Sequence, residues 1–138
     1  MASSSSPRGP LLSVILDTNI LIYSASQPFD IVHSLEQMSL NSVLVPSFVI
    51  SELESLSRGP GKRSKVAALA LRIASQFKTI RASVDGRTVD DKLENLATRG
   101  GYIVATADSP LRRRLLAVGV PVIYLKDGRL VTGDVPLG

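Results

Sequence analysis

The stretch SVILDTNILIYS, residues 13–24, places one acid directly behind a short apolar run. Ser13 to Leu16 predict a strand buried on both faces, because aliphatic residues follow one another without the polar alternation of a half-exposed strand. Asp17 then stands at the C-terminal end of that strand. Ligands of open α/β sheets bind at this edge, so Asp17 is a candidate site residue in need of partners.

Apolar runs and helical patterns alternate along the rest of the chain. The dipeptide Asp127-Gly128 predicts a hairpin that returns the chain as an edge strand. Alternating strands and helices with short loops specify an α/β fold, a three-layer α/β/α sandwich with a central, mainly parallel sheet. Strands are expected at 43–46, 78–82, 102–106 and 120–125; helices are expected at 29–40, from Ser47 as cap to 57, and at 65–77, 89–99 and 109–118.

Length and composition limit the classes of protein to which the chain can belong. The chain has 138 residues, of which 44% are hydrophobic and 20% charged, as is typical of a folded globular protein. We expect a disordered tail at residues 1–11, which are rich in serine and proline, and a single domain at residues 12–138. No apolar run is long enough to cross a bilayer, and residues 1–11 carry no apolar signal region. A cytoplasmic location without a membrane partner is the expectation.

The scarcity of some residue types restricts the chemistry. The absence of cysteine and the presence of one histidine exclude disulfides, thiolate zinc sites and multi-histidine metal sites. A bound metal would need oxygen ligands, which points to magnesium or manganese. The net charge of +4 and the pI of about 9.8 favour a polyanionic partner, because lysine and arginine neutralise phosphates.

Several acids are expected at the sheet edge that Asp17 occupies. Clustered carboxylates repel one another unless a cation lies among them, and hard divalent cations prefer carboxylate oxygens. One or two Mg²⁺ or Mn²⁺ ions there would activate a water and neutralise charge on a phosphodiester, which predicts metal-dependent phosphodiester hydrolysis. Each acid follows a predicted strand or lies on an adjacent helix: Asp17, Glu52, Asp90, Asp91 and Asp108.

Each of these acids also has an ordinary structural explanation. Asp17 and Asp108 could cap the helices that follow them, and Glu52 could be a solvated helix residue. Asp90 and Asp91 could simply favour the positive N-terminal end of their helix. The metal-site hypothesis therefore depends on the acids acting together.

Four motifs, in order, resemble those of PIN-domain ribonucleases. They are LDTNILI, VPSFVISELESL, VDDKLENLA and VATADSPLRRR, and the resemblance covers about residues 13–125. It implies that the metal-binding and catalytic acids are Asp17, Glu52, Asp90 and Asp108, with Asn19, Asp91 and Thr106 as accessory residues.

The adjacent acids Asp90 and Asp91 compete for one position in the third motif. Successive helix residues point about 100° apart, so the two are not expected to face one metal. Asp90 is preferred because Leu93 and Ala97 follow it by three and seven residues, as in that motif.

The YIVATAD segment and the later VPVIYL strand look most like the archaeal and eukaryotic subgroup tied to processing of small-subunit ribosomal RNA. This resemblance implies an endoribonuclease whose substrate is a ribosomal RNA precursor, with a homodimer and ribosome-assembly proteins as further partners. Two alternatives stay open: a VapC-type toxin ribonuclease, and a non-catalytic module that binds RNA or ribosome-assembly proteins.

Two basic segments flank the proposed acidic pocket. Each alone is explained as a solvated face, yet a basic rim that tracks phosphates is what a nuclease needs. The candidate RNA-binding residues are Arg58, Lys62, Arg63, Lys65, Arg112 and Arg113.

Overall fold

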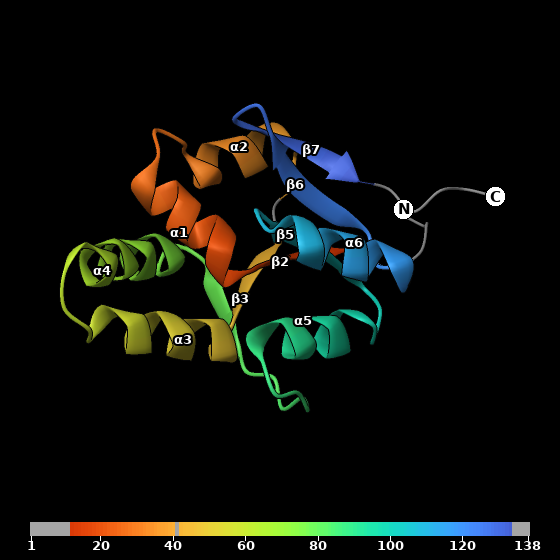
Figure 1. Ribbon diagram of the computed structural model, residues 1–138. Helices are drawn as coiled ribbons and strands as arrows, with labels where there is room; N and C mark the ends of the chain where they lie inside the picture. The colour runs from red at the N-terminus through yellow and green to blue at the C-terminus, as the bar shows by residue number, and fades with distance from the viewer. Residues whose placement is uncertain (1–11, 41, 134–138) are drawn as a thin grey trace.

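A computed structural model describes residues 12–40 and 42–133 and arranges them around one six-stranded sheet (Figure 1). The predicted tail at residues 1–11 lies outside the described residues, as do residues 134–138 of the predicted domain. Counted along the chain, the strands are β2 (Ser13–Leu16), β3 (Val43–Pro46), β4 (Lys78–Ile80), β5 (Tyr102–Thr106), β6 (Val122–Lys126) and β7 (Arg129–Gly133).

The strand order across the sheet is β4-β3-β2-β5-β6-β7, and the pairings are parallel except that of β6 with β7. Those last two strands form the predicted hairpin. Its turn residues Asp127 and Gly128 both have positive φ, of 53° and 74°, which a tight hairpin turn of this type requires.

Helices cover the sheet in the three-layer α/β/α arrangement expected from the sequence. In Figure 1, helices α1, α3 and α4 gather on one side of the view and α5 and α6 on the other, so the C-terminal ends of β2 and β5 open between them. The helices are α1 (Thr18–Ser26), α2 (Ile31–Gln37), α3 (Ser47–Ser57), α4 (Lys62–Ala74), α5 (Val89–Ala97) and α6 (Ser109–Ala117). None of the helices in the described part of the chain is long and apolar enough to span a membrane.

Strand β2 lies at the centre of the sheet, between β3 and β5. Val14, Ile15 and Leu16 are completely buried, as the apolar run predicts. Helix α1 begins immediately behind this strand, because the side chain of Asp17 caps it by accepting a hydrogen bond from the amide of Ile20.

Three helix starts differ from the sequence prediction. Helix α2 begins at Ile31, two residues after the predicted start, because the side chain of Asp30 caps it. Helix α4 begins at Lys62, three residues before the predicted start, because Gly61 adopts a φ of 83° that lets the preceding loop turn directly into the helix. Helix α3 includes Ser47, which was expected to cap it. Pro46 takes the cap position instead, and it makes no side-chain hydrogen bond there.

Candidate active site

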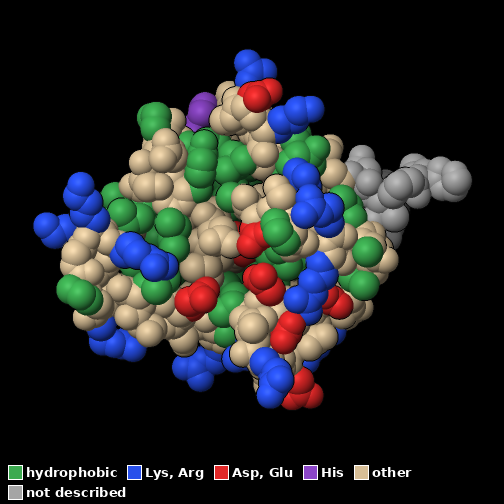
Figure 2. Space-filling model, in the orientation of Figure 1, with side chains coloured by type: hydrophobic (Ala, Val, Ile, Leu, Met, Phe, Trp, Pro, Cys, Tyr) green, Lys and Arg blue, Asp and Glu red, His purple; other side chains and the backbone are tan. Residues whose placement is uncertain are grey.

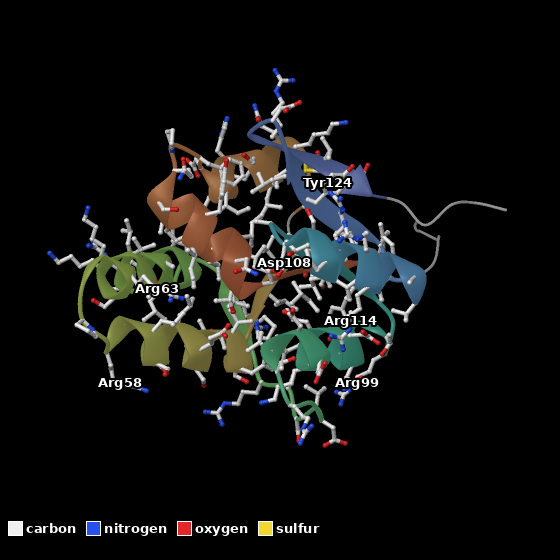
Figure 3. The ribbon with its side chains drawn as sticks, viewed as in Figure 1. Arg58, Arg63, Arg99, Asp108, Arg114 and Tyr124 are labelled. Atoms are coloured by element: carbon white, nitrogen blue, oxygen red, sulfur yellow. The ribbon has the colours of Figure 1, made fainter. Side chains whose placement is uncertain are left out.

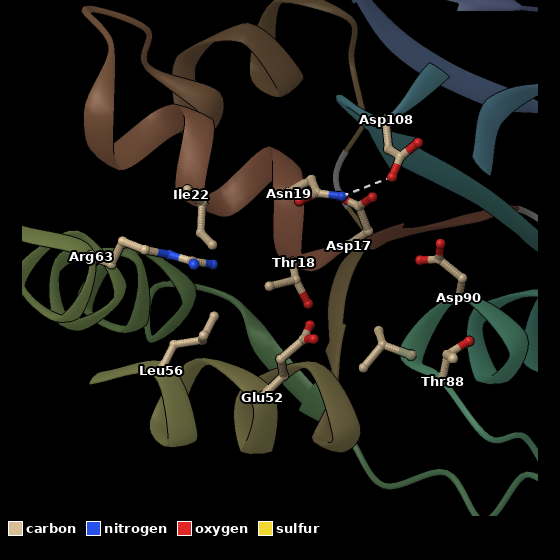
Figure 4. A pocket seen from close by; sticks show the side chains of 11 residues that line it. Asp17, Thr18, Asn19, Ile22, Glu52, Leu56, Arg63, Thr88, Asp90 and Asp108 are labelled. Atoms are coloured by element: carbon tan, nitrogen blue, oxygen red, sulfur yellow. Dashed lines mark hydrogen bonds between the residues drawn. The ribbon is translucent and has the colours of Figure 1, made fainter. Parts of the chain in front are cut away.

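The four acids predicted to bind metal line one open cavity of about 290 Å³ (Figure 4). They come from four separate elements at the C-terminal edge of the sheet, so the fold brings together residues that are far apart in sequence. Figure 2 shows acidic side chains near the middle of this face, with lysine and arginine side chains on both sides of them. This acidic pocket is bordered by Asp17, Glu52, Asp90 and Asp108, together with Thr18, Asn19 and Arg63.

Both carboxylate oxygens of Asp17 are held by the protein. One oxygen caps α1, accepting a hydrogen bond of 2.7 Å from the Ile20 amide. The other accepts a hydrogen bond from the hydroxyl of Thr106. Strands β2 and β5 pair in parallel with Leu16 opposite Ala105, so the next residues, Asp17 and Thr106, also lie side by side. The carboxylate of Asp17 therefore caps α1 and also borders the acidic pocket, so the two explanations of this residue do not exclude each other.

Asp108 is tied into the same hydrogen-bond network. Its amide donates to the Thr106 hydroxyl over 3.0 Å, and its side chain caps α6 by accepting from the Leu111 amide over 3.1 Å. The side-chain amide of Asn19 donates to the other carboxylate oxygen of Asp108 over 3.2 Å. Asn19 and Thr106, both expected as accessory residues, thus connect the acids that follow β2 and β5.

Burial and mutual repulsion shift the ionisation of two acids. Burial raises the pKa of Asp17 from its usual 3.8 to about 7, and the charges of Asp90 and Asp108 add to the rise, while the hydrogen bonds from Thr106 and Ile20 oppose it. Partial burial and the charge of Asp108 also raise the pKa of Asp90. A cation bound among these carboxylates would relieve both effects.

The donor set fits a hard divalent cation in its chemistry. The acidic side chains offer only oxygen atoms, which Mg²⁺ and Mn²⁺ prefer. The hydroxyl oxygen of Thr18 lines the same pocket, is buried, and has no hydrogen-bond partner among the described residues. Within residues 12–40 and 42–133, however, no three acidic or histidine side chains already converge as a set of metal ligands. The four carboxylates border the pocket without meeting at one point.

Asp91 faces away from the acidic pocket and binds α6. Its carboxylate pairs with the Arg114 guanidinium at 2.6 Å and accepts a hydrogen bond from the Arg87 amide. Arg114 lowers the pKa of Asp91 and also pairs with Glu94, one helical turn further along α5. Of the two adjacent acids in the third motif, Asp90 is the one at the pocket, while Asp91, expected as an accessory residue, does not line it.

The basic residues expected to bind RNA are placed differently from one another. Arg63 lines the acidic pocket, and Lys62 lines a neighbouring cleft. Figure 3 shows Arg63 between α4 and the space bordered by α1 and α3, with Arg58 away from it. The Arg112 guanidinium lies 4.2 Å from the centre of the Tyr124 ring. The others, which line neither of these two hollows, are exposed: Arg58, Lys65 and Arg113.

Two residues at or beside the site were not anticipated. Thr18 lies within the first motif between Asp17 and Asn19, and this position next to a strand-end acid is the sequence signal that could have identified it as a site residue. Arg114 belongs to a run of three arginines, and nothing in the run indicates which of them reaches α5. That pairing depends on how α5 and α6 pack.

Known proteins similar to this chain cover most of its length. Ribonuclease VapC9 of Archaeoglobus fulgidus is 32% identical over 118 residues, which are 85% of each chain. The human rRNA-processing protein FCF1 homolog is 33% identical over 128 residues, 88% of this chain and 61% of that protein. The chain thus spans about three fifths of the human relative's length. FCF1 of Saccharomyces cerevisiae is 32% identical over 131 residues, 92% of this chain and 67% of that protein.

The fold is also found in a solved structure. A domain of a functionally unknown protein from Methanocaldococcus jannaschii superposes with a TM-score of 0.66 at 18% identity, covering 92% of this chain and 98% of that domain. At that level of identity the likeness concerns the fold alone. The sequence pattern of the family described as "PIN like domain" matches residues 14–128. The chain therefore belongs to the PIN-like domain family.

Proposed function

We propose that this protein is a metal-dependent endoribonuclease that hydrolyses RNA phosphodiester bonds. The observation that carries the proposal is the meeting of Asp17, Glu52, Asp90 and Asp108 around one pocket. Gathering carboxylates so that the pKa of two of them rises costs folding stability, and such arrangements concentrate at functional sites. Membership in a family with a ribonuclease relative supports the same reaction class.

The four acids would hold one or two Mg²⁺ or Mn²⁺ ions and would be the catalytic residues. When bound, such ions supply an activated water and neutralise the charge that develops on the phosphate. The chain's own residues orient the acids: the Thr106 hydroxyl holds Asp17, and the Asn19 amide holds Asp108. The Thr18 hydroxyl is buried beside the pocket without a partner among the described residues, and it would turn to a water or a phosphate oxygen when metal and substrate fill the pocket.

Arg63 supplies the positive charge that a polyanionic substrate needs at this pocket. Its guanidinium borders the acids, and Lys62 continues the basic rim along α4. Phosphate contacts of this kind position a nucleic acid without reading its sequence. Arg58, Lys65, Arg112 and Arg113 remain predicted contributors to the same rim.

We further propose that the substrate is a ribosomal RNA precursor, by analogy with the named role of the FCF1 relatives. As part of this proposal, the protein forms a homodimer, binds ribosome-assembly proteins and acts in the cytoplasm. A VapC-type ribonuclease is the second candidate, favoured by the match with the archaeal VapC9 over 85% of both chains. Cleavage of transfer RNA with ribosomal precursors left intact, and growth arrest on expression, would favour this second candidate.

The test is RNA cleavage with a matched pair of variants on one helix. Purified protein is incubated with structured precursor ribosomal RNA and transfer RNA, with Mn²⁺, with Mg²⁺ or with EDTA. Glu52→Gln removes an acid that lines the pocket, whereas Glu54→Gln changes an exposed acid two residues away. We expect metal-dependent cleavage by the wild type and by Glu54→Gln, and its loss in Glu52→Gln and Asp17→Asn. RNA binding without cleavage by any of these proteins would favour the non-catalytic module.

A further inference from the structure

We propose that a cleft between α1, α3 and α4 binds one unpaired nucleotide of the RNA substrate, next to the phosphate that is cleaved. This inference rests on the proposed function, because it concerns how the same site receives its substrate. The cleft has a volume of about 340 Å³, within the range of ligand pockets, about 300 to 1,000 Å³. We call it the α4 cleft; its lining includes Ile22, Leu56, Val66, Ser26, Lys62 and Arg63.

The α4 cleft is continuous with the acidic pocket. Asn19, Ile22, Leu56 and Arg63 line both hollows. In Figure 4 the Arg63 side chain extends from α4 between Ile22 and Leu56, toward the acids. An RNA strand whose phosphate lies at the acids therefore brings the adjacent nucleotide to the cleft.

The two sides of the α4 cleft match the two parts of a nucleotide. Ile22, Leu56 and Val66 are half-buried aliphatic side chains that offer an apolar surface to the face of a base. Lys62 and Arg63 are exposed cations that open α4, and neither forms an ion pair with another residue of the described part of the chain. Free cations beside an apolar wall suit a base joined to a phosphate better than a purely apolar ligand.

The occupant has to be an unpaired nucleotide. In a duplex the faces of the bases are stacked on their neighbours, and side chains reach them only in single-stranded loops, bulges and ends. The α4 cleft is thus expected to make the protein prefer single-stranded segments, while its aliphatic wall makes no hydrogen-bond readout of the base edge.

The test is RNA binding measured in EDTA, so that the result depends on neither metal nor cleavage. Fluorescence anisotropy compares a labelled single-stranded oligoribonucleotide with the same strand in a duplex. Two matched pairs on α4 separate the cleft from general charge. Val66→Glu and Lys62→Glu alter residues that line the cleft, while Leu69→Glu and Arg72→Glu make equal charge changes at exposed positions of α4 outside it.

We expect each cleft variant to bind the single strand about tenfold more weakly than its control, which corresponds to about 1.4 kcal/mol. The wild type is expected to bind the duplex less well than the single strand. Circular dichroism melting checks folding, and Lys62→Glu, at an exposed position, keeps the test valid if Val66→Glu unfolds. Equal losses within each pair, or equal affinity for duplex and single strand, would overturn the α4 cleft as a nucleotide site.

Cleavage measurements separate this inference from the proposed function. On the metal-loaded protein, Lys62→Glu is expected to raise KM with kcat nearly unchanged, whereas Asp17→Asn is expected to lower kcat. If no protein cleaves RNA but the paired difference in binding persists, the nuclease proposal fails and the nucleotide site stands. If the wild type cleaves RNA and each cleft variant binds RNA as well as its control does, the nuclease proposal stands and only the proposed nucleotide site is refuted.

Discussion

The Thr106 hydroxyl donates a hydrogen bond to the buried carboxylate of Asp17, although 89 residues separate them in sequence. The contact follows from the parallel register of β2 and β5, which puts the residues behind the two strands next to each other. The same hydroxyl accepts a hydrogen bond from the amide of Asp108. One small polar side chain thereby links two of the four acids of the pocket.

Thr106→Val is expected to impair catalysis through Asp17. The hydrogen bond from Thr106 lowers the pKa of Asp17, so its loss raises that pKa further and moves the acidic limb of the cleavage profile to higher pH. The partly buried amide of Asp108 also loses its acceptor, at a cost of about 1 kcal/mol in stability. Rates of RNA cleavage across pH measure the shift. Thr106→Ser keeps the hydroxyl and serves as the control; identical profiles for the two variants would refute a positioning role.

The metal-free protein is expected to lose stability as the pH rises from about 4 to about 7. In this window the folded chain retains the proton of Asp17, whose pKa is about 7, while the unfolded chain with its usual 3.8 has released it. The free energy of unfolding then falls with a slope of up to about 1.4 kcal/mol per pH unit from this group. Urea unfolding in EDTA at a series of pH values measures the slope. Asp17→Asn should flatten it, and an unchanged slope would contradict the raised pKa.

Arg114→Gln should strengthen metal binding without any direct contact to the metal site. The Arg114 charge lowers the pKa of Asp90 and also repels a divalent cation beside that carboxylate, so its removal raises the affinity of the ionised acids for the metal. The lost ion pairs are partly exposed and should cost no more than about 1 kcal/mol in stability. Titration with Mn²⁺ below and above neutral pH should show the larger gain at the higher pH, because at the lower pH the raised pKa of Asp90 lets protons compete with the ion. Arg113→Gln changes an exposed neighbour and should bind metal like the wild type; equal affinities for both variants would sink the prediction.

Thr18→Val is expected to lower the cleavage activity without lowering the stability of the folded protein. The Thr18 hydroxyl is buried without a partner among the described residues, so replacing it with a methyl group of similar size leaves the metal-free protein as stable, or up to about 1 kcal/mol more stable. Cleavage should fall by about tenfold, because the variant lacks the hydrogen bond that the hydroxyl is proposed to make to a water or phosphate oxygen. Melting temperatures in EDTA and cleavage rates with Mn²⁺ are compared with those of Thr18→Ser. Full activity in Thr18→Val would show that the hydroxyl has no part in the reaction.

Local sequence patterns were sufficient for the fold and for the positions of the strand-end acids. The buried run before Asp17 and the run before Asp108 define two strands, and both carboxylates lie where parallel strands end. Both acids can be assigned to one edge of the sheet without knowing the order of the strands, because the C-terminal ends of parallel strands share that edge. The helix boundaries at Ser47 and Lys62 were less accurate, because a glycine with positive φ and a proline cap override local propensity there.

The amino-acid sequence by itself determined the α/β fold and the kind of chemistry its acids offer, because burial patterns and donor types are properties of neighbouring residues. Only the tertiary structure decided where the charged helix residues point. Asp91, expected as an accessory residue of the site, pairs with Arg114 instead, and Arg63 borders the acids while Arg58 does not. Along an isolated helix each of these side chains favours water equally, so its direction is set by the packing of one helix against another.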